Sequence, residues 1–406
     1  MKPQTLSRKL FITTFLVCAS SSWAFAQDIN AVGDRLKAVM ENQGMTISWA
    51  SASGDASEMV LDGVKVSMVG TPGEFAVGTV TLSDITEENG GYRIGSVALP
   101  DYNITEDGAT INISGMEMAG LRLSAEGATD PLANLMMYDT ADVESLTVSK
   151  DGKELFAMKG AHAEATAPAD GKPMTFVVST ESWNADLSSV EDPQSKAVIE
   201  ALGYQTLSGT VEMEGSWQPT DGRMAISTYD ITVNDAGTLG ITVDLGGYTP
   251  DFIKSMQDMQ KKMGEQPAGA DNSAQGLAML GLMQQLTFHA ASVRFDDDSL
   301  TNKLLEFVAN TQGLKPADIA NQAKALAPMM LAQVVQDQAL IKSVSDAVTK
   351  FLDDPQSLEI SAEPAEPVPF ALIMAGAMSP SPQDLVKTLG VSVTGGAKTL
   401  LEALRQ

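Results

Sequence analysis

Two histidines, His162 and His289, are the side chains in this 406-residue sequence best suited to transfer protons near neutral pH. A general acid or base also needs a partner and a reacting group within hydrogen-bond reach. Neither histidine lies in an HExxH zinc motif, and the sequence has no GxSxG serine motif. The sequence therefore favours ordinary strand positions for both histidines over a catalytic role.

The acidic run Asp296, Asp297 and Asp298 is the strongest candidate for a metal site. Calcium takes six to eight oxygen ligands, and EF-hand loops space their carboxylates at alternate positions. Three adjacent aspartates point in different directions, so they are weak candidates. We expect instead that Asp298 or Ser299 caps the helix that follows, where negative charge is favoured.

Methionine is abundant, with 22 residues, and thioether sulfurs can bind Cu(I). Met256, Met259 and Met263, however, recur at helical spacing, as residues facing a core do. Methionine more commonly fills irregular cores or lines pockets for variable apolar ligands. The sequence gives no reason to expect a cofactor.

Acidic residues dominate the charge, with 52 Asp and Glu against 26 Lys and Arg, a net charge of −26. Nucleic acids and anionic lipid surfaces repel such a chain, so we exclude a nucleic-acid partner. Pairs of carboxylates must also occur by chance among so many acidic residues. A hydrolase with an unrecognised carboxylate site therefore stays open as a third hypothesis.

Residues 1–26 have the pattern of a cleavable export signal. Lys2, Arg8 and Lys9 precede an apolar run, and a small-x-small motif ends at Ala26, before Gln27. The apolar run is about half the ~20 residues that a membrane-spanning helix needs. We expect cleavage between Ala26 and Gln27, a periplasmic location with an extracellular one also open, and no transmembrane segment in the mature chain.

The single cysteine, Cys18, lies within this signal. The mature chain therefore has no disulfide or thiolate metal site and must be held together by burial. Its length exceeds the ~250–300 residues at which single cores commonly divide. We expect two parts after the signal, one over 27–250 and one over 251–406.

The first part alternates apolar and polar residues from about 46 to 247, the period of half-buried strands. Asp151-Gly152 predicts a two-residue hairpin turn, and Asp221-Gly222 and the 234–237 stretch predict further turns. Sequential hairpins form an antiparallel meander. A helix is expected before it, around 32–44, and short helices at 130–138 and 192–203.

Helical spacing dominates after Pro250. Helices are expected near 299–312, 316–334 and 337–352, with strands near 286–295, 358–362 and 391–394. The segment Gly264 to Gly276 is rich in Gly, Pro, Ala, Asn and Ser and predicts a mobile loop. The fold class is thus α+β, a large curved antiparallel sheet packed with a mainly helical second part.

Two stretches, 277–283 and 370–378, are nearly all apolar yet too short to span a bilayer. They must be buried in the core, line a cavity, or form an exposed docking patch. The residues that we expect to line an apolar site are Leu277, Met279, Leu280, Met283, Phe370, Ile373 and Met374.

The second part resembles a group of secreted alphaproteobacterial proteins of unknown function. The resemblance rests on the stretches 293–300, 351–358 and 364–370, which begin Val-Arg-Phe-Asp-Asp-Asp, Phe-Leu-Asp-Asp-Pro and Pro-Ala-Glu-Pro. It covers about 200–394. It implies an exported, β-rich protein with a helical C-terminal part, and it assigns no functional residues.

The leading hypothesis is a non-enzymatic envelope protein that binds a lipid-like ligand or a protein partner. The alternative is a structural or protein-interaction module of the periplasm, which adds a partner's strand to an exposed sheet edge.

Overall fold

The computed structural model describes residues 29–68, 73–128, 131–169, 171–264, 273–377 and 383–396. The expected signal segment with its cleavage site at Ala26 and Gln27 lies outside these residues. So do residues 265–272, which make up most of the expected mobile loop.

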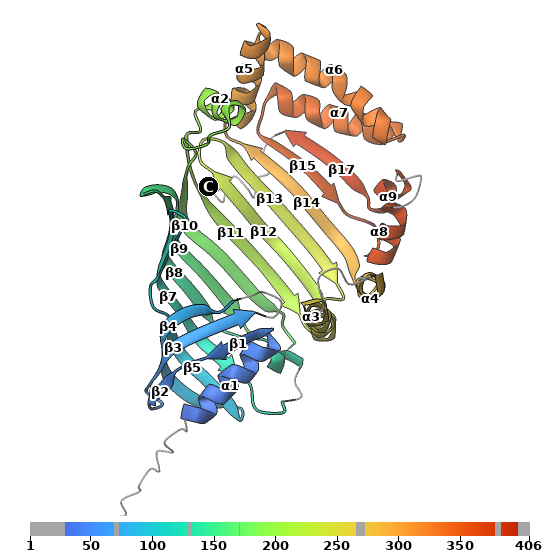
Figure 1. Cartoon of the computed structure of the whole chain (residues 1–406). Coiled ribbons are helices and arrows are strands. Elements are labelled where there is room, and N and C mark those ends of the chain that lie inside the picture. The colour runs from blue at the N-terminus through green and yellow to red at the C-terminus, as the bar shows by residue number, and fades with distance from the viewer. Residues whose placement is uncertain are drawn as a thin grey trace, which may run out of the picture.

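One antiparallel sheet of 17 strands is the framework of the described chain (Figure 1). Neighbouring strands follow one another along the chain, as the alternating pattern and its turns predict. The strands are β1 (Met45–Ser48), β2 (Ser51–Gly54), β3 (Glu58–Met68), β4 (Phe75–Glu88), β5 (Gly91–Ala98), β6 (Tyr102–Glu106), β7 (Ala109–Leu123), β8 (Thr140–Lys150), β9 (Lys153–Thr166), β10 (Met174–Asp186), β11 (Thr206–Gln218), β12 (Arg223–Val233), β13 (Gly237–Gly246), β14 (Thr287–Asp297), β15 (Ser357–Ala362), β16 (Val368–Pro369) and β17 (Val391–Gly396).

The sheet is not closed. Among the described strands, β17 pairs only with β15, while β1 and β2 pair only with β3. The short strand β6 pairs with β7 beside β5, and β16 pairs with the start of β14. The sheet therefore has an open edge at each end.

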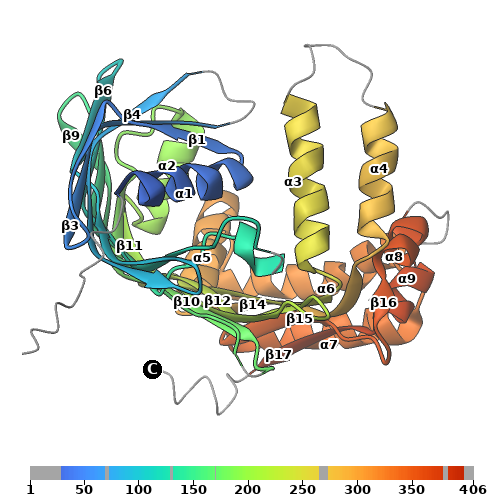
Figure 2. The same cartoon turned by 90° about the horizontal axis from the view of Figure 1, so that it is seen from below.

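Most helices lie in the second half of the chain. They are α1 (Ile29–Asn42), α2 (Pro193–Leu202), α3 (Pro250–Gly264), α4 (Ser273–Met283), α5 (Leu300–Gln312), α6 (Pro316–Val334), α7 (Gln338–Asp353), α8 (Phe370–Ala377) and α9 (Gln383–Thr388), with a 3-10 helix η1 at Pro131–Asn134. Figure 2 shows the sheet curving around α1, with α3 and α4 standing out from the sheet on the same side.

Local signals account for the elements that the sequence predicts well. Asp192 caps α2 by accepting the Ser195 N–H at 2.8 Å, and Gly203 ends the helix in the left-handed conformation. Asp151 and Gly152 both have positive φ, as the two-residue hairpin turn requires.

The structure corrects the predicted bounds of two elements, the helix at 130–138 and the loop at 264–276. The expected helix at 130–138 is only the 3-10 turn η1, because Met137 already pairs with Arg122 of the sheet, and its expected cap Asp130 lies outside the described residues. The expected loop was too long at its end, since α4 begins at Ser273 and contains Gly276. Contacts of α4 with α3 and α8 outweigh the weak helix propensity of that glycine.

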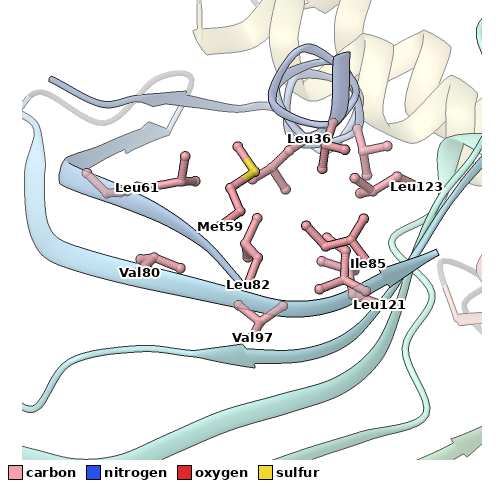
Figure 3. Close-up of a cluster of buried hydrophobic side chains, with 13 residues drawn as sticks. Leu36, Met59, Leu61, Val80, Leu82, Ile85, Val97, Leu121 and Leu123 are labelled. Atoms are coloured by element: carbon pink, nitrogen blue, oxygen red, sulfur yellow. The ribbon is translucent and has the colours of Figure 1, made fainter. Parts of the chain in front are cut away.

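A buried cluster joins α1 to the first strands (Figure 3). Val32, Leu36 and Val39 project from α1 onto Met59 and Leu82, and all five are nearly inaccessible to solvent. The apolar spacing that predicted this helix is thus the spacing that buries it. We call the sheet face that α1 covers the inner face and the opposite one the outer face.

Candidate functional site

The inner face is apolar well beyond the strands that α1 covers. Residues directly opposite one another on neighbouring strands share a face, so a row of partners can be followed across the sheet. The row that starts at buried Met59 contains Leu82, Val97, Met118, Ala141, Ala163, Val178, Met213 and Tyr229. Every member is apolar or aromatic.

The neighbouring row on the outer face is mostly polar. It contains Thr81, Ala98, Glu117, Asp142, His162, Ser179, Glu212, Asp230, Gly240, Arg294, Glu359 and Thr394. The two faces thus differ in polarity from β4 to β17. Such a difference in polarity is typical of a sheet with one face covered and the other in contact with water.

The inner face continues onto the last strands without a polar interruption. Ile231, two residues after Tyr229, pairs with Leu239, and Leu239 pairs with Phe295. The next row on this face contains Ile241, Val293, Ile360 and Val393. These side chains lie on β13, β14, β15 and β17.

Among the described helices, α7 and α3 meet this part of the inner face near the strand ends. The Phe351 ring of α7 meets Phe295 edge to face, with 6.4 Å between the ring centroids. At the other end, the indole N–H of Trp217 donates to the carbonyl of Tyr248, 2.7 Å away, just before α3. Figure 1 shows the middle of β11 to β14 between these helices.

The apolar side chains between these helices remain open to solvent. Leu239 is 39% exposed, Val293 48% and Ile360 51%. Val178, Met213, Tyr229, Ile241 and Val393 around them are half-buried. We call these eight residues the open inner face. Its apolar side chains resemble those under α1, but no helix buries them to the same degree.

The seven residues expected to line an apolar site lie elsewhere. Leu277, Met279, Leu280 and Met283 are on α4, and Phe370, Ile373 and Met374 are on α8. The two helices contact each other beyond the strand ends. None of the seven side chains is buried, and Leu277 is 70% exposed. The apolar lining was expected only in the short apolar stretches of α4 and α8. The alternation along β10 to β15 was the signal for the open inner face.

The two histidines lie on the outer face, among ion pairs. His162 Nδ1 is 2.6 Å from a carboxylate oxygen of Asp142, its cross-strand partner, and Ser179 is its partner on the other side. Asp, His and Ser thus stand in one row. No hydrogen bond joins Ser179 to His162 in the described chain. The row therefore has the residue types of a serine hydrolase without the contact through which a histidine activates a serine.

His289 stands beside a second ion pair. The Arg223 Nη1 group donates to His289 Nδ1 at 2.7 Å, while the same guanidinium binds Asp244. Burial and then the nearby Arg223 charge lower the pKa of His289 below its ordinary value. The imidazole is thus kept neutral.

The three consecutive aspartates point to different partners. Asp296 pairs with Arg294, Asp297 accepts the Thr301 N–H at 2.7 Å, and Asp298 is exposed. Ser299, one of the two expected caps, does hold the N-cap position of α5. Its hydroxyl makes no capping hydrogen bond, and Asp297, which was not expected as a cap, supplies the oxygen. No group of three or more His, Cys, Asp or Glu within the described ranges could hold a metal ion.

Four carboxyl groups in the described part of the chain have a pKa shifted below the ordinary value, Asp55, Asp139, Asp186 and Asp192. Burial raises the pKa of Asp139, but hydrogen bonds and ion pairs with Arg93 and Arg122 outweigh burial. A general acid needs the opposite shift, so none of these four groups supports the hydrolase hypothesis.

A family model described as "Uncharacterized protein" matches residues 230–396, less than half of the chain. The matched stretch runs from β12 to β17 and contains most of the open inner face. The expected resemblance of the second part to uncharacterised proteins is confirmed at this level. No curated protein matches the chain. None of the helices described is both long enough and apolar enough to span a membrane.

Proposed function

We propose that this protein is an exported, non-enzymatic binding protein of the bacterial envelope that takes up lipid-like ligands on its open inner face. One observation carries the proposal: the apolar inner face extends past α1, whereas the neighbouring row of the outer face is mostly polar. Apolar side chains left in water cost about 25 cal/mol per Å² of surface. An acyl chain bound along this face would shield these side chains from water. Each methylene group that the chain buries would contribute about 0.8 kcal/mol to the binding free energy.

The location in the proposal rests on the first 26 residues, whose pattern is that of a periplasmic export signal. The envelope offers lipids as abundant apolar ligands. An acidic chain stays dispersed there because its molecules repel one another.

The proposal is tested by measuring ligand uptake in two variants, one with asparagine on the inner face and one with asparagine on the outer face. Val293 and Ile360 lie on the open inner face, whereas Val177, with a similar exposure of 40%, pairs with glutamates on the outer face. V293N/I360N should weaken binding of a fluorescent fatty acid at least tenfold, because each buried amide left unpaired costs about 1–3 kcal/mol. V177N should bind as the wild type does.

Organic extraction of the protein purified from cell envelopes, followed by mass spectrometry, gives the independent readout. We expect a bound lipid that is reduced in V293N/I360N. A clean extract from the wild type together with no fatty-acid uptake would overturn the proposal, as would equal loss in V177N.

A second candidate is a protein-interaction module, and the open edge at β17 favours it. Among the described strands, none but β15 pairs with β17, and backbone groups at such an edge can pair with a partner's strand. Crosslinking in intact envelopes separates the two functions: one dominant protein partner at β17 favours the module, and lipid without such a partner favours the carrier.

A further inference from the structure

The helix α4 consists of apolar residues and glycine apart from Ser273 and Gln275. Its eleven residues include no charged side chain. The exposed positions Gly276, Leu277, Ala278, Leu280 and Gly281 cover an arc of roughly 200° at 100° per residue. None of these five positions is polar. A helix with such a surface is normally enclosed in a protein core or a membrane.

The helix α8 extends this surface. Its backbone is held beside α4, since the Phe370 N–H donates to the Leu286 carbonyl, 3.0 Å away and three residues past the end of α4. It also contains no charged residue, and Leu372 and Ala375 are exposed. We call Leu277, Ala278, Leu280, Leu372 and Ala375 the α4–α8 surface.

The distribution of apolar residues distinguishes a lipid partner from a protein partner. A helix that docks in a protein groove places its anchors on one stripe and keeps a polar back. A bilayer contacts apolar side chains on every side. Gly276 and Gly281 also cost about 1 kcal/mol each in a water-exposed helix, and glycine is more frequent in helices that contact lipid.

The length of α4 limits how deeply the helix can insert into a bilayer. Eleven residues rise about 16 Å, roughly half of the ~30 Å hydrocarbon thickness. This length suits insertion into one leaflet, and it agrees with the absence of a spanning helix in the described part of the chain.

Charge on the neighbouring helix fits lipid phosphates. α3 carries three lysines against two aspartates, in a chain whose net charge is −26. Lys262 is exposed and lines a cleft of about 490 Å³ that Ala278 and Gly281 of α4 also line. Asp258 lines the same cleft, but its carboxylate pairs with Lys254. The Lys262 ammonium group can reach headgroup phosphates, as lysines flanking apolar helices do. The acidic remainder of the molecule disfavours strongly anionic membranes.

We infer that the α4–α8 surface docks the protein on a bilayer of zwitterionic phospholipid. This surface is separate from the open inner face, so docking does not require that the inner face binds a ligand. Together the two features describe a protein that meets lipid at a membrane.

Flotation of the mature chain with phosphatidylcholine vesicles tests the inference. We expect the wild type to float with the vesicles and L277D/L280D to lose at least tenfold in partitioning. The matched control is M329D/M330D, because both methionines are 66% exposed on α6, away from the α4–α8 surface, and its partitioning should stay within twofold of the wild type. Thermal melting followed by circular dichroism confirms that each variant is folded.

Two further measurements separate the outcomes. In L277W, the tryptophan emission should shift to the blue when vesicles are added, and fatty-acid uptake by L277D/L280D should match that of the wild type. Failure of the wild type to float would overturn the inference, and so would equal loss in M329D/M330D. A dimer in solution that L277D/L280D abolishes, without vesicle binding, would assign the surface to a second copy and also overturn it.

Discussion

The lowered pKa of the His289 imidazole predicts that the stability of the protein depends on pH near neutrality. The pKa of His289 is lowered by burial and then by Arg223, so the unfolded chain binds a proton there more readily than the folded one does. The contribution of His289 to stability is complete above its unfolded pKa of about 6.5 and is lost as the pH falls below that value.

We therefore predict that the midpoint of urea unfolding falls between pH 7.5 and pH 5.5 in the wild type, and falls less in His289→Gln. The two proteins are first compared at pH 8, where the histidine is neutral in both states, to obtain the effect of the substitution itself. Parallel midpoints over the whole range would contradict the prediction.

The sequence alone could not predict which polar residues lie next to one another on the sheet. No sequence motif indicates that Asp142, His162 and Ser179 stand in one row, because these residues come from three strands. Cross-strand register depends on turns and bulges along the whole meander. Groups of residues that come from different strands can be identified only when the strand register is known.

At the scale of elements, the packing of α1 is the best-defined source of stability. Leu36 is 6% exposed and belongs to the buried cluster between α1 and the first strands. Leu36→Ala removes apolar contacts and leaves a cavity, which costs about 2–5 kcal/mol. Asp34→Ala, at an exposed position of the same helix, should change stability by less than about 0.5 kcal/mol. Urea unfolding of both variants checks the prediction, and similar losses would contradict it.

Elements with local signals were predictable, and elements set by distant contacts were not. Asp192 with Gly203 defines α2, and Asp151-Gly152 defines a hairpin, within a few residues of sequence. Nothing local indicates that Gly115 and Gly160 adopt positive φ inside long strands, where they interrupt regular pleating. Likewise, the sequence could not show whether the apolar residues of α4 are buried in a core, line a cavity or are exposed. The structure shows that Leu277 and Leu280 are exposed.

At the scale of the whole molecule, stability should be uneven along the sheet. The strands follow one another in chain order, so each strand rests mainly on its two neighbours, as in repeat proteins. The buried cluster under α1 draws its strand residues from β3, β4, β5 and β7. At the other end, β17 has one neighbouring strand and is covered by α7.

We predict that amide hydrogen exchange is slowest in β3, β4 and β5 and becomes faster towards β15 and β17, because local opening costs least where few apolar contacts are lost. Leu36→Ala should speed exchange in β3 to β7 while leaving β13 to β15 within a factor of about three of the wild type. Asp34→Ala serves as the control, with no change in either region. If every strand loosened together in Leu36→Ala, the sheet would be one cooperative unit. The open inner face would then be stabilised by the α1 core rather than by its own neighbours, and a ligand bound there would protect the whole sheet instead of its last strands.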